Sequence, residues 1–154
     1  MLQLPAYGVW LANIGGWLVI QLGLSYLFAR MPAHWFQRPD VVSPSEVAFY
    51  ERTLRIRLWK DKLPDGGGLF KGGFPKKRLL SRKPEYLRTF AAETKRGEWN
   101  HWCAMVPAPL FFIWNEALAG LIIMLYAFGA NAPFVAVLRY NRYRLQLMLR
   151  SIAE

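Results

Sequence analysis

The separation of charged from apolar residues constrains the fold of this chain more than any other feature. Residues 2–29 and 99–138 share one Asp, Glu, Lys or Arg, which is Glu116, although the 154 residues include 20 Lys or Arg and 10 Asp or Glu. A soluble domain spreads charge over all its surface elements, whereas a charge at the centre of a bilayer costs roughly 2.5–3.5 kcal/mol. The pattern predicts an all-α integral membrane protein that forms a single membrane domain over residues 1–154.

The first apolar block, residues 7–29, is long enough to cross a bilayer once. A helix rises 1.5 Å per residue, and the hydrocarbon core is about 30 Å thick. No positively charged stretch precedes the block, and Arg30 follows it. We therefore expect a retained membrane helix rather than a cleaved signal peptide.

The second apolar block has the composition of a helical hairpin. Residues 102–114 are few for a span and contain Pro107 and Pro109, which favours a short or re-entrant helix. A polar turn at Asn115-Glu116 precedes residues 117–138, which are long enough to cross the membrane. The prediction is about three transmembrane helices, with a kink near Pro133 in the last of them.

The remaining segments are basic and indicate the orientation. Residues 31–100 hold 15 Lys or Arg against 8 Asp or Glu, and the tail 139–154 also carries net positive charge. The positive-inside bias places both in the cytoplasm, with the N-terminus outside, in a multi-pass protein of the cell membrane. The basic charge predicts contact with membrane lipids, and no nucleic-acid-binding motif is present. Residues 45–60 have the pattern of a cytoplasmic amphipathic helix, followed by a Gly-rich loop and by a helix from Ser81 or Lys83 to about Arg96.

A hairpin would bring two polar clusters, residues 93–102 and 139–144, together at one membrane surface. Glu98 and His101 are three residues apart and would share a helix face. A carboxylate beside an imidazole suits a general base acting on a hydroxyl, but the spacing alone fits an interfacial hydrogen bond better. No metal site is expected, because the only other histidine is His34.

Three motifs resemble those of the glycosyl-4,4'-diaponeurosporenoate acyltransferase family, which acts in staphyloxanthin-type carotenoid synthesis. They are residues 57–66, residues 93–98 followed by His101-Trp102, and residues 131–133 followed by 139–145. Tyr143 stands where the resemblance leads us to expect a proline. The resemblance implies transfer of a fatty acyl group to a sugar hydroxyl of a glycosylated C30 carotenoid acid.

Combining the resemblance with the clusters gives a predicted site at the cytoplasmic membrane face. His101 would be the general base and Glu98 would orient it. The predicted substrate-binding residues are Arg96, Glu93, Trp59, Lys60, Asp65, Arg139, Asn141 and Arg142. The donor would be acyl-CoA, the acceptor a glycosylated carotenoid or similar glycolipid, and no cofactor is expected. The alternative is a non-catalytic membrane subunit that binds lipid or carotenoid within a larger complex.

Overall fold

The computed structural model describes residues 2–65, 74–76 and 78–154. Four α-helices dominate them, and no strand occurs in these ranges, which confirms the all-α prediction. The α-helices are α1 (Ala6–Arg30), α2 (Pro44–Arg52), α3 (Pro84–Met105) and α4 (Ala117–Ala153). The short 3-10 helices are η1 (Ala33–Phe36), η2 (Ile56–Leu58), η3 (Lys60–Lys62) and η5 (Ala108–Ile113).

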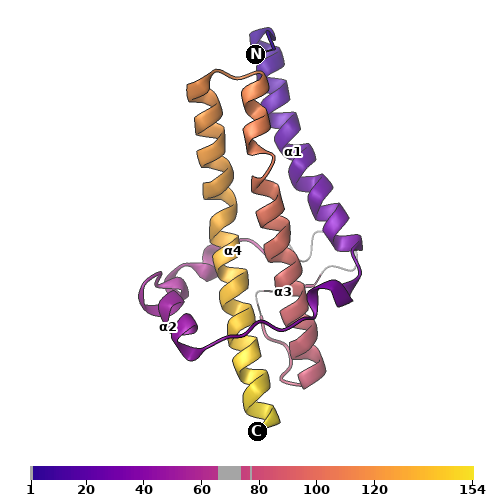
Figure 1. Ribbon diagram of the computed structural model, residues 1–154, viewed down its shortest axis with the longest axis vertical. Helices are drawn as coiled ribbons and strands as arrows, with labels where there is room; N and C mark the ends of the chain where they lie inside the picture. Colours follow the sequence, from indigo (N-terminus) through magenta and orange to yellow (C-terminus); the bar gives the residue numbers. More distant parts are fainter. Residues whose placement is uncertain (1, 66–73, 77) are drawn as a thin grey trace.

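Helices α1, α3 and α4 lie side by side along the long axis of the molecule (Figure 1). Helix α3 ascends towards the end that holds the N-terminus, η5 continues in that direction, and α4 returns over the full length of the molecule. The backbone N–H of Leu2 donates to the carbonyl oxygen of Ile113 at 2.6 Å, so the N-terminus lies at the tip of this hairpin. The chain thus folds back where the sequence predicts.

Two helices, not about three, are long and apolar enough to cross a membrane in the described part of the chain, and they are α1 and α4. The predicted short or re-entrant helix at residues 102–114 is divided between the end of α3 and the six-residue η5. Pro109 has no backbone N–H and Pro107 lies at the N-cap of η5, so the α-helical hydrogen-bond pattern is interrupted here.

Helix α1 and the first half of α4 do not form a protein core. Phe28 is the only buried residue of α1, and most large apolar side chains along α1 and the first half of α4 are exposed. A core helix of a soluble protein would bury these side chains, and apolar surface of this extent marks an interaction site.

A polar contact holds α1 against the hairpin tip. The side-chain oxygen of Asn13 accepts hydrogen bonds from Trp114 Nε1 and Asn115 Nδ2, both at 2.8 Å. Asn13 Nδ2 donates in return to Asn115 Oδ1 at 3.0 Å. Both amides are therefore satisfied by partners within an otherwise apolar region, as buried polar groups require.

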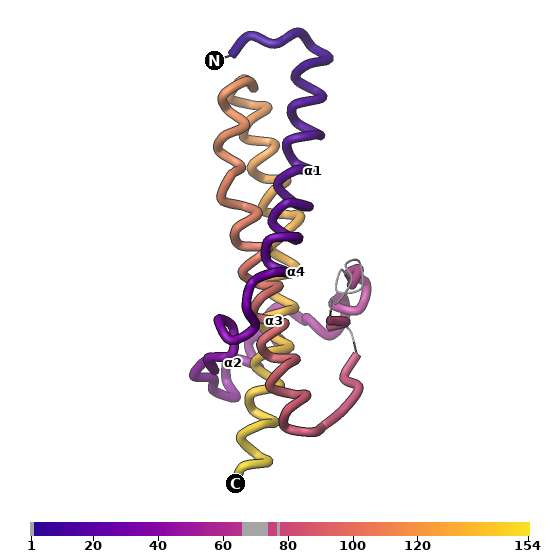
Figure 2. The backbone as a smooth tube through the Cα atoms, turned by 90° about the vertical axis from the view of Figure 1, so that its right-hand side faces the viewer, coloured from indigo at the N-terminus to yellow at the C-terminus, as the bar shows by residue number. Residues whose placement is uncertain are grey.

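The predicted amphipathic helix over residues 45–60 is shorter than expected. Helix α2 begins after a capping box formed by Ser43 and Glu46 and ends at Arg52. Arg55 then adopts a left-handed conformation with φ of 46°, and the turn carries Ile56 into the interior, where it is fully buried. The segment from α2 to η3 passes around α4 from one side of the bundle to the other (Figure 2).

Helices α3 and α4 extend further than the sequence predicts. Helix α3 starts at Pro84 with Lys83 at its N-cap, which agrees with the second of the two predicted starts, but it continues to Met105 instead of ending near Arg96. Residues 117–138 and the tail form one helix of 37 residues, with Pro133 inside it. The predicted Gly-rich loop falls mainly on residues 66–73, which lie outside the described residues.

Candidate functional site

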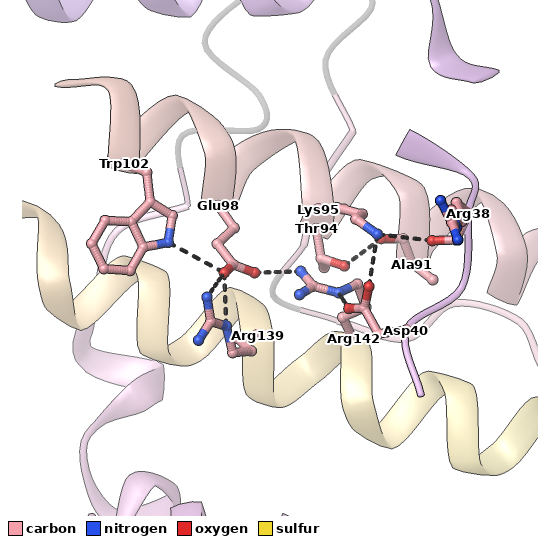
Figure 3. Close-up of polar contacts among 9 residues, drawn as sticks. All are labelled: Arg38, Asp40, Ala91, Thr94, Lys95, Glu98, Trp102, Arg139 and Arg142. Atoms are coloured by element: carbon pink, nitrogen blue, oxygen red, sulfur yellow. Dashed lines mark hydrogen bonds and ion pairs between the residues drawn. The ribbon is translucent and has the colours of Figure 1, made fainter. Parts of the chain in front are cut away.

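A buried carboxylate, Glu98, joins the two long helices (Figure 3). Glu98 lies on α3, is 3% exposed, and faces two arginines of α4. Arg139 Nε donates to Oε1 at 2.7 Å, and Arg142 Nη1 donates to Oε2. Trp102 Nε1 also donates to Oε1, at 3.3 Å. Glu98 therefore connects α3 to α4 through a network in which both of its oxygens are satisfied.

Asp40, which follows η1, extends this network. Its carboxylate accepts from Arg142 Nε at 2.6 Å and forms an ion pair with Lys95 Nζ at 2.7 Å. Burial alone would raise the pKa of Asp40, but the hydrogen bond from Lys95 and the charge of Arg142 lower it below its usual value. We define Asp40, Lys95, Glu98, Arg139 and Arg142 as the ion-pair cluster.

The side chain of His101 is held by Asn131 of α4. His101 Nδ1 lies 2.8 Å from Asn131 Oδ1, and the imidazole stacks on Phe134 with ring centroids 4.7 Å apart. Asn131 Nδ2 donates to the carbonyl oxygen of Ala127 at 2.8 Å, which turns the amide oxygen towards the histidine. Because that oxygen only accepts, Nδ1 carries the proton and the lone pair of the neutral ring is on Nε2.

This geometry differs from the predicted pairing of His101 with Glu98. Glu98 contacts Arg139, Arg142 and Trp102, and no hydrogen bond joins it to His101 among the described residues. The orienting partner is Asn131, which lies two residues before Pro133, where the sequence predicts a kink. Its sequence distance of 30 residues from His101 gives no local signal, and only the pairing of α3 with α4 reveals the contact.

The surroundings of His101 favour its neutral form. Burial lowers its pKa below 6.5, the hydrogen bond to Asn131 opposes this, and the charge of Lys76 lowers the pKa further. A neutral imidazole with a free Nε2 is the form that accepts a proton.

A basic pocket of 170 Å³ lies between α3, α4 and the segments that precede α3. Its polar lining residues are Lys60, Lys76, Asn141 and Arg144. Its apolar lining residues are Leu79, Phe90, Leu145 and Met148. Lys60 and Asn141 belong to the predicted substrate-binding set. Lys76 does not, because a lysine among other basic residues of a loop carries no pattern that separates it from its neighbours. Arg144 lies in the predicted polar cluster of residues 139–144 but was not predicted to bind substrate.

The other predicted substrate-binding residues have contacts within the protein. Arg96 pairs with Glu93 at 2.7 Å and donates to the carbonyl oxygen of Met31 at 3.1 Å. Trp59 Nε1 donates to the carbonyl oxygen of Leu54 at 2.9 Å. Asp65 accepts from the backbone N–H of Lys76 at 2.8 Å. The structure thus separates the predicted set into residues of the ion-pair cluster, residues of the basic pocket and residues that brace neighbouring segments.

The fold and these contacts define a small helical protein with two candidate membrane spans, an oriented histidine and an adjacent basic pocket. The chain belongs to the glycosyl-4,4'-diaponeurosporenoate acyltransferase family, whose sequence model matches residues 32–151. It is therefore an acyltransferase associated with carotenoid biosynthesis.

Relatives from two strains of Staphylococcus aureus, bovine RF122 / ET3-1 and N315, are each 31% identical over 139 residues. The matched region covers 87% of this chain and 84% of each relative, and both are named glycosyl-4,4'-diaponeurosporenoate acyltransferase. No solved structure matches the chain.

Proposed function

We propose that this protein transfers a fatty acyl group from acyl-CoA to a sugar hydroxyl of a glycosylated carotenoid, or a similar glycolipid, at the cytoplasmic face of the cell membrane. The names of the relatives support the acceptor class. The exposed apolar side chains of α1 and of the first half of α4 support membrane insertion. The excess of Lys and Arg in residues 31–100 and in the tail supports a cytoplasmic location for both segments.

The observation that carries the proposed mechanism is the hydrogen bond between His101 and Asn131. It leaves Nε2 of a neutral imidazole able to take the proton of the sugar hydroxyl as its oxygen attacks the thioester carbon. The tetrahedral intermediate then collapses, the carbon–sulfur bond breaks, and the CoA sulfur leaves with the proton held by His101. The products are the sugar ester and free CoA, and no further reactant is needed.

The level of His101 along the bundle suits two amphiphilic substrates. Asn131, its partner, lies in α4 a short distance before the charged stretch that starts at Arg139, so His101 is near the boundary between apolar and charged halves. A glycosylated carotenoid would place its sugar at such a boundary, and the acyl chain of the donor would enter the lipid from it.

The predicted substrate-binding residues differ in the exposure and the contacts of their side chains, and these differences separate substrate contact from positioning. The side chain of Arg139 is 36% exposed, so we assign it contact with the substrate oxygen atoms, together with Lys60 and Asn141 in the pocket. Arg142 is 5% exposed and bonded to two carboxylates, and Arg96, Glu93, Trp59 and Asp65 are held by the protein. We assign these five residues to positioning. Membership of an acyltransferase family argues against the alternative of a non-catalytic subunit.

The test measures transfer of labelled acyl groups from acyl-CoA to a glycosylated carotenoid in membranes that contain the protein. His101→Ala should reduce ester formation by a factor of roughly 100 or more, the range for loss of a general base. His34→Ala is the matched control, because His34 is exposed on η1 and belongs to neither the ion-pair cluster nor the basic pocket. Equal activity of the two variants at equal membrane abundance would remove His101 from the mechanism.

A further inference from the structure

We infer that the basic pocket lined by Lys60, Lys76, Asn141 and Arg144 binds the phosphate groups of the acyl donor. This inference rests on the proposed function, and it assigns recognition of the donor to cations that lie outside the ion-pair cluster.

The number of direct ion pairs distinguishes the pocket from the ion-pair cluster. Arg139 and Arg142 share the carboxylate of Glu98, and Arg142 also binds Asp40. Lys76 Nζ donates to the carbonyl oxygen of Phe74 at 3.0 Å, and within the described ranges neither Lys76 nor Arg144 forms a direct ion pair. The charges of Glu93 and Asp65 act on Lys76 from a greater distance, and the charge of Arg144 acts on Glu51. Lys60 pairs with its sequence neighbour Asp61 at 2.8 Å. The described residues that line the pocket include three cations and no carboxylate, a composition that suits an anion.

Lys76 connects the pocket to the histidine. Its Cε lies 3.7 Å from the position that a Cβ on Gly97 would occupy, and Gly97 precedes His101 by four residues on α3. Residues four apart share a helix face. Phe90, which lines the pocket, lies seven residues before Gly97 and so on nearly the same side of α3.

Helix α4 presents a matching row of residues. Asn141 and Met148 line the pocket, and Phe134, which stacks on His101, is seven residues before Asn141. Phe90 and His101 are eleven residues apart, or about 16 Å along the helix. The extended pantetheine arm that joins the phosphates of CoA to its thioester can span such a separation.

The order of these features along the bundle matches the order of groups in an acyl-CoA. The pocket lies nearer the charged end of α4, and His101 lies nearer the apolar half. An acyl-CoA can therefore lie along the bundle in one direction, with its phosphates in the pocket, its thioester at His101 and its acyl chain in the lipid. At 170 Å³ the pocket has room for a diphosphate but not for a whole nucleotide, since sites that enclose drug-sized ligands begin near 300 Å³.

Contacts behind the pocket hold its cations in place. The hydroxyl of Tyr140, a fully buried residue, donates to Glu51 at 2.7 Å, and Glu51 pairs with Arg57 just before Lys60. Asp65 accepts from the backbone of Lys76. Two segments that precede α3 are thereby fixed against the helix pair.

The experiment compares Arg144→Gln with Arg88→Gln, which removes the same charge from an exposed position on α3 outside the pocket. The full chain is placed in nanodiscs of phosphatidylcholine, and binding of CoA is measured directly. Acyl transfer is measured with acyl-CoA and with the phosphate-free acyl-N-acetylcysteamine. Arg144→Gln should weaken CoA binding and raise the KM for acyl-CoA about tenfold or more, the effect of one charge-assisted hydrogen bond. Transfer from acyl-N-acetylcysteamine should not change.

Equal CoA binding by the two variants, or no CoA binding by the wild-type protein, would overturn the pocket assignment. Displacement of CoA by added phosphatidylglycerol would also overturn it, because the pocket would then be a site for lipid headgroups. The proposed function fails separately, when the wild-type protein transfers acyl groups from neither donor.

Discussion

At the scale of single residues, Asn131 is a neutral partner for a histidine, and this sets the pH range in which the site can work. A carboxylate partner would raise the pKa of the imidazole and favour its charged form. Here burial dominates, and the pKa of His101 is lowered. The ring is consequently able to act as a base down to pH values at which an exposed histidine is protonated.

The pH dependence of kcat/KM for acyl transfer tests this arrangement. We expect activity to be constant above the ordinary histidine pKa of 6.5 and to fall as the pH drops through the lower pKa of His101. Asn131→Asp, which adds a carboxylate beside the ring, should shift this fall to higher pH. If activity fell at the same pH in the wild-type protein and in Asn131→Asp, this result would contradict a contact between His101 and Asn131.

Glu98 should contribute more to stability than any exposed carboxylate. Glu98→Gln leaves Arg142 buried with one anionic partner, so the free energy of unfolding should fall by roughly 3–5 kcal/mol, the usual effect of breaking a buried ion pair. Glu85→Gln on the same helix is the control, because Glu85 is exposed and should change stability by less than about 1 kcal/mol. Denaturant titration in detergent measures both, and similar values would show that the ion-pair cluster does not hold the helices together.

Local pattern identified some of these residues and not others. Glu98, His101, Arg139 and Arg142 stand out because they are polar residues at the ends of apolar blocks. Asn131 and Lys76 could not be assigned from pattern, because their importance depends on partners 30 and 25 residues away that only folding brings near.

At the scale of elements, the close approach of η5 to α4 depends on a glycine. A Cβ added at Gly120 would lie 2.5 Å from the ring of Phe112, which is shorter than any normal contact. Gly129, on the same helix, has no atom within 4 Å of such a Cβ. A side chain larger than that of glycine is therefore sterically disfavoured at position 120, near the start of α4, but not at position 129.

Alanine at these two positions should have opposite effects. Gly120→Ala should lower the Tm in detergent, because Phe112 must move, with a cost of about 1–3 kcal/mol. Gly129→Ala should leave the Tm unchanged or raise it, because alanine has the higher helix propensity. Thermal unfolding followed by circular dichroism measures both, and a loss of stability confined to Gly129→Ala would be inconsistent with the packing of η5.

Element boundaries were predictable where a local signal was strong. One of the two predicted starts of α3, at Lys83, agrees with its N-cap, and the polar pair before Ala117 marks the start of α4. The end of α2 was not predictable, because burial of Ile56, a tertiary effect, favours the turn at Arg55 over continuation of the helix. The same limitation applies to residues 102–114, where the backbone changes to a 3-10 helix beyond Met105.

At the scale of the whole molecule, the hairpin followed from the sequence, whereas the number of membrane-crossing helices did not. Apolar composition identifies segments that prefer lipid. Whether such a segment can span a membrane also depends on the type and length of its helix, and composition does not determine these. Segregation of charge is the signal that predicts lipid-facing segments, because placing ions in hydrocarbon has a large cost.

The orientation is testable with single cysteines after Cys103→Ala removes the only native thiol. Glu116→Cys lies at the exposed hairpin tip and Ser151→Cys lies near the exposed end of α4. A membrane-impermeant maleimide should label the first in intact cells and the second only after permeabilisation, as the positive-inside bias requires. Labelling of both from the same side would contradict an α4 that crosses the membrane.

The continuity of α4 has a mechanical consequence. One helix, roughly 55 Å long, joins the exposed apolar residues of the bundle to residues that line the pocket. The number of residues between Ala117 and Asn131 therefore sets how far the partner of His101 lies from the hairpin tip. Insertion of one residue in that interval would shift Asn131 by about 1.5 Å along the helix axis and rotate it by about 100° around the axis. Under the proposed function, the length of this one helix would fix the height of His101 relative to the bilayer.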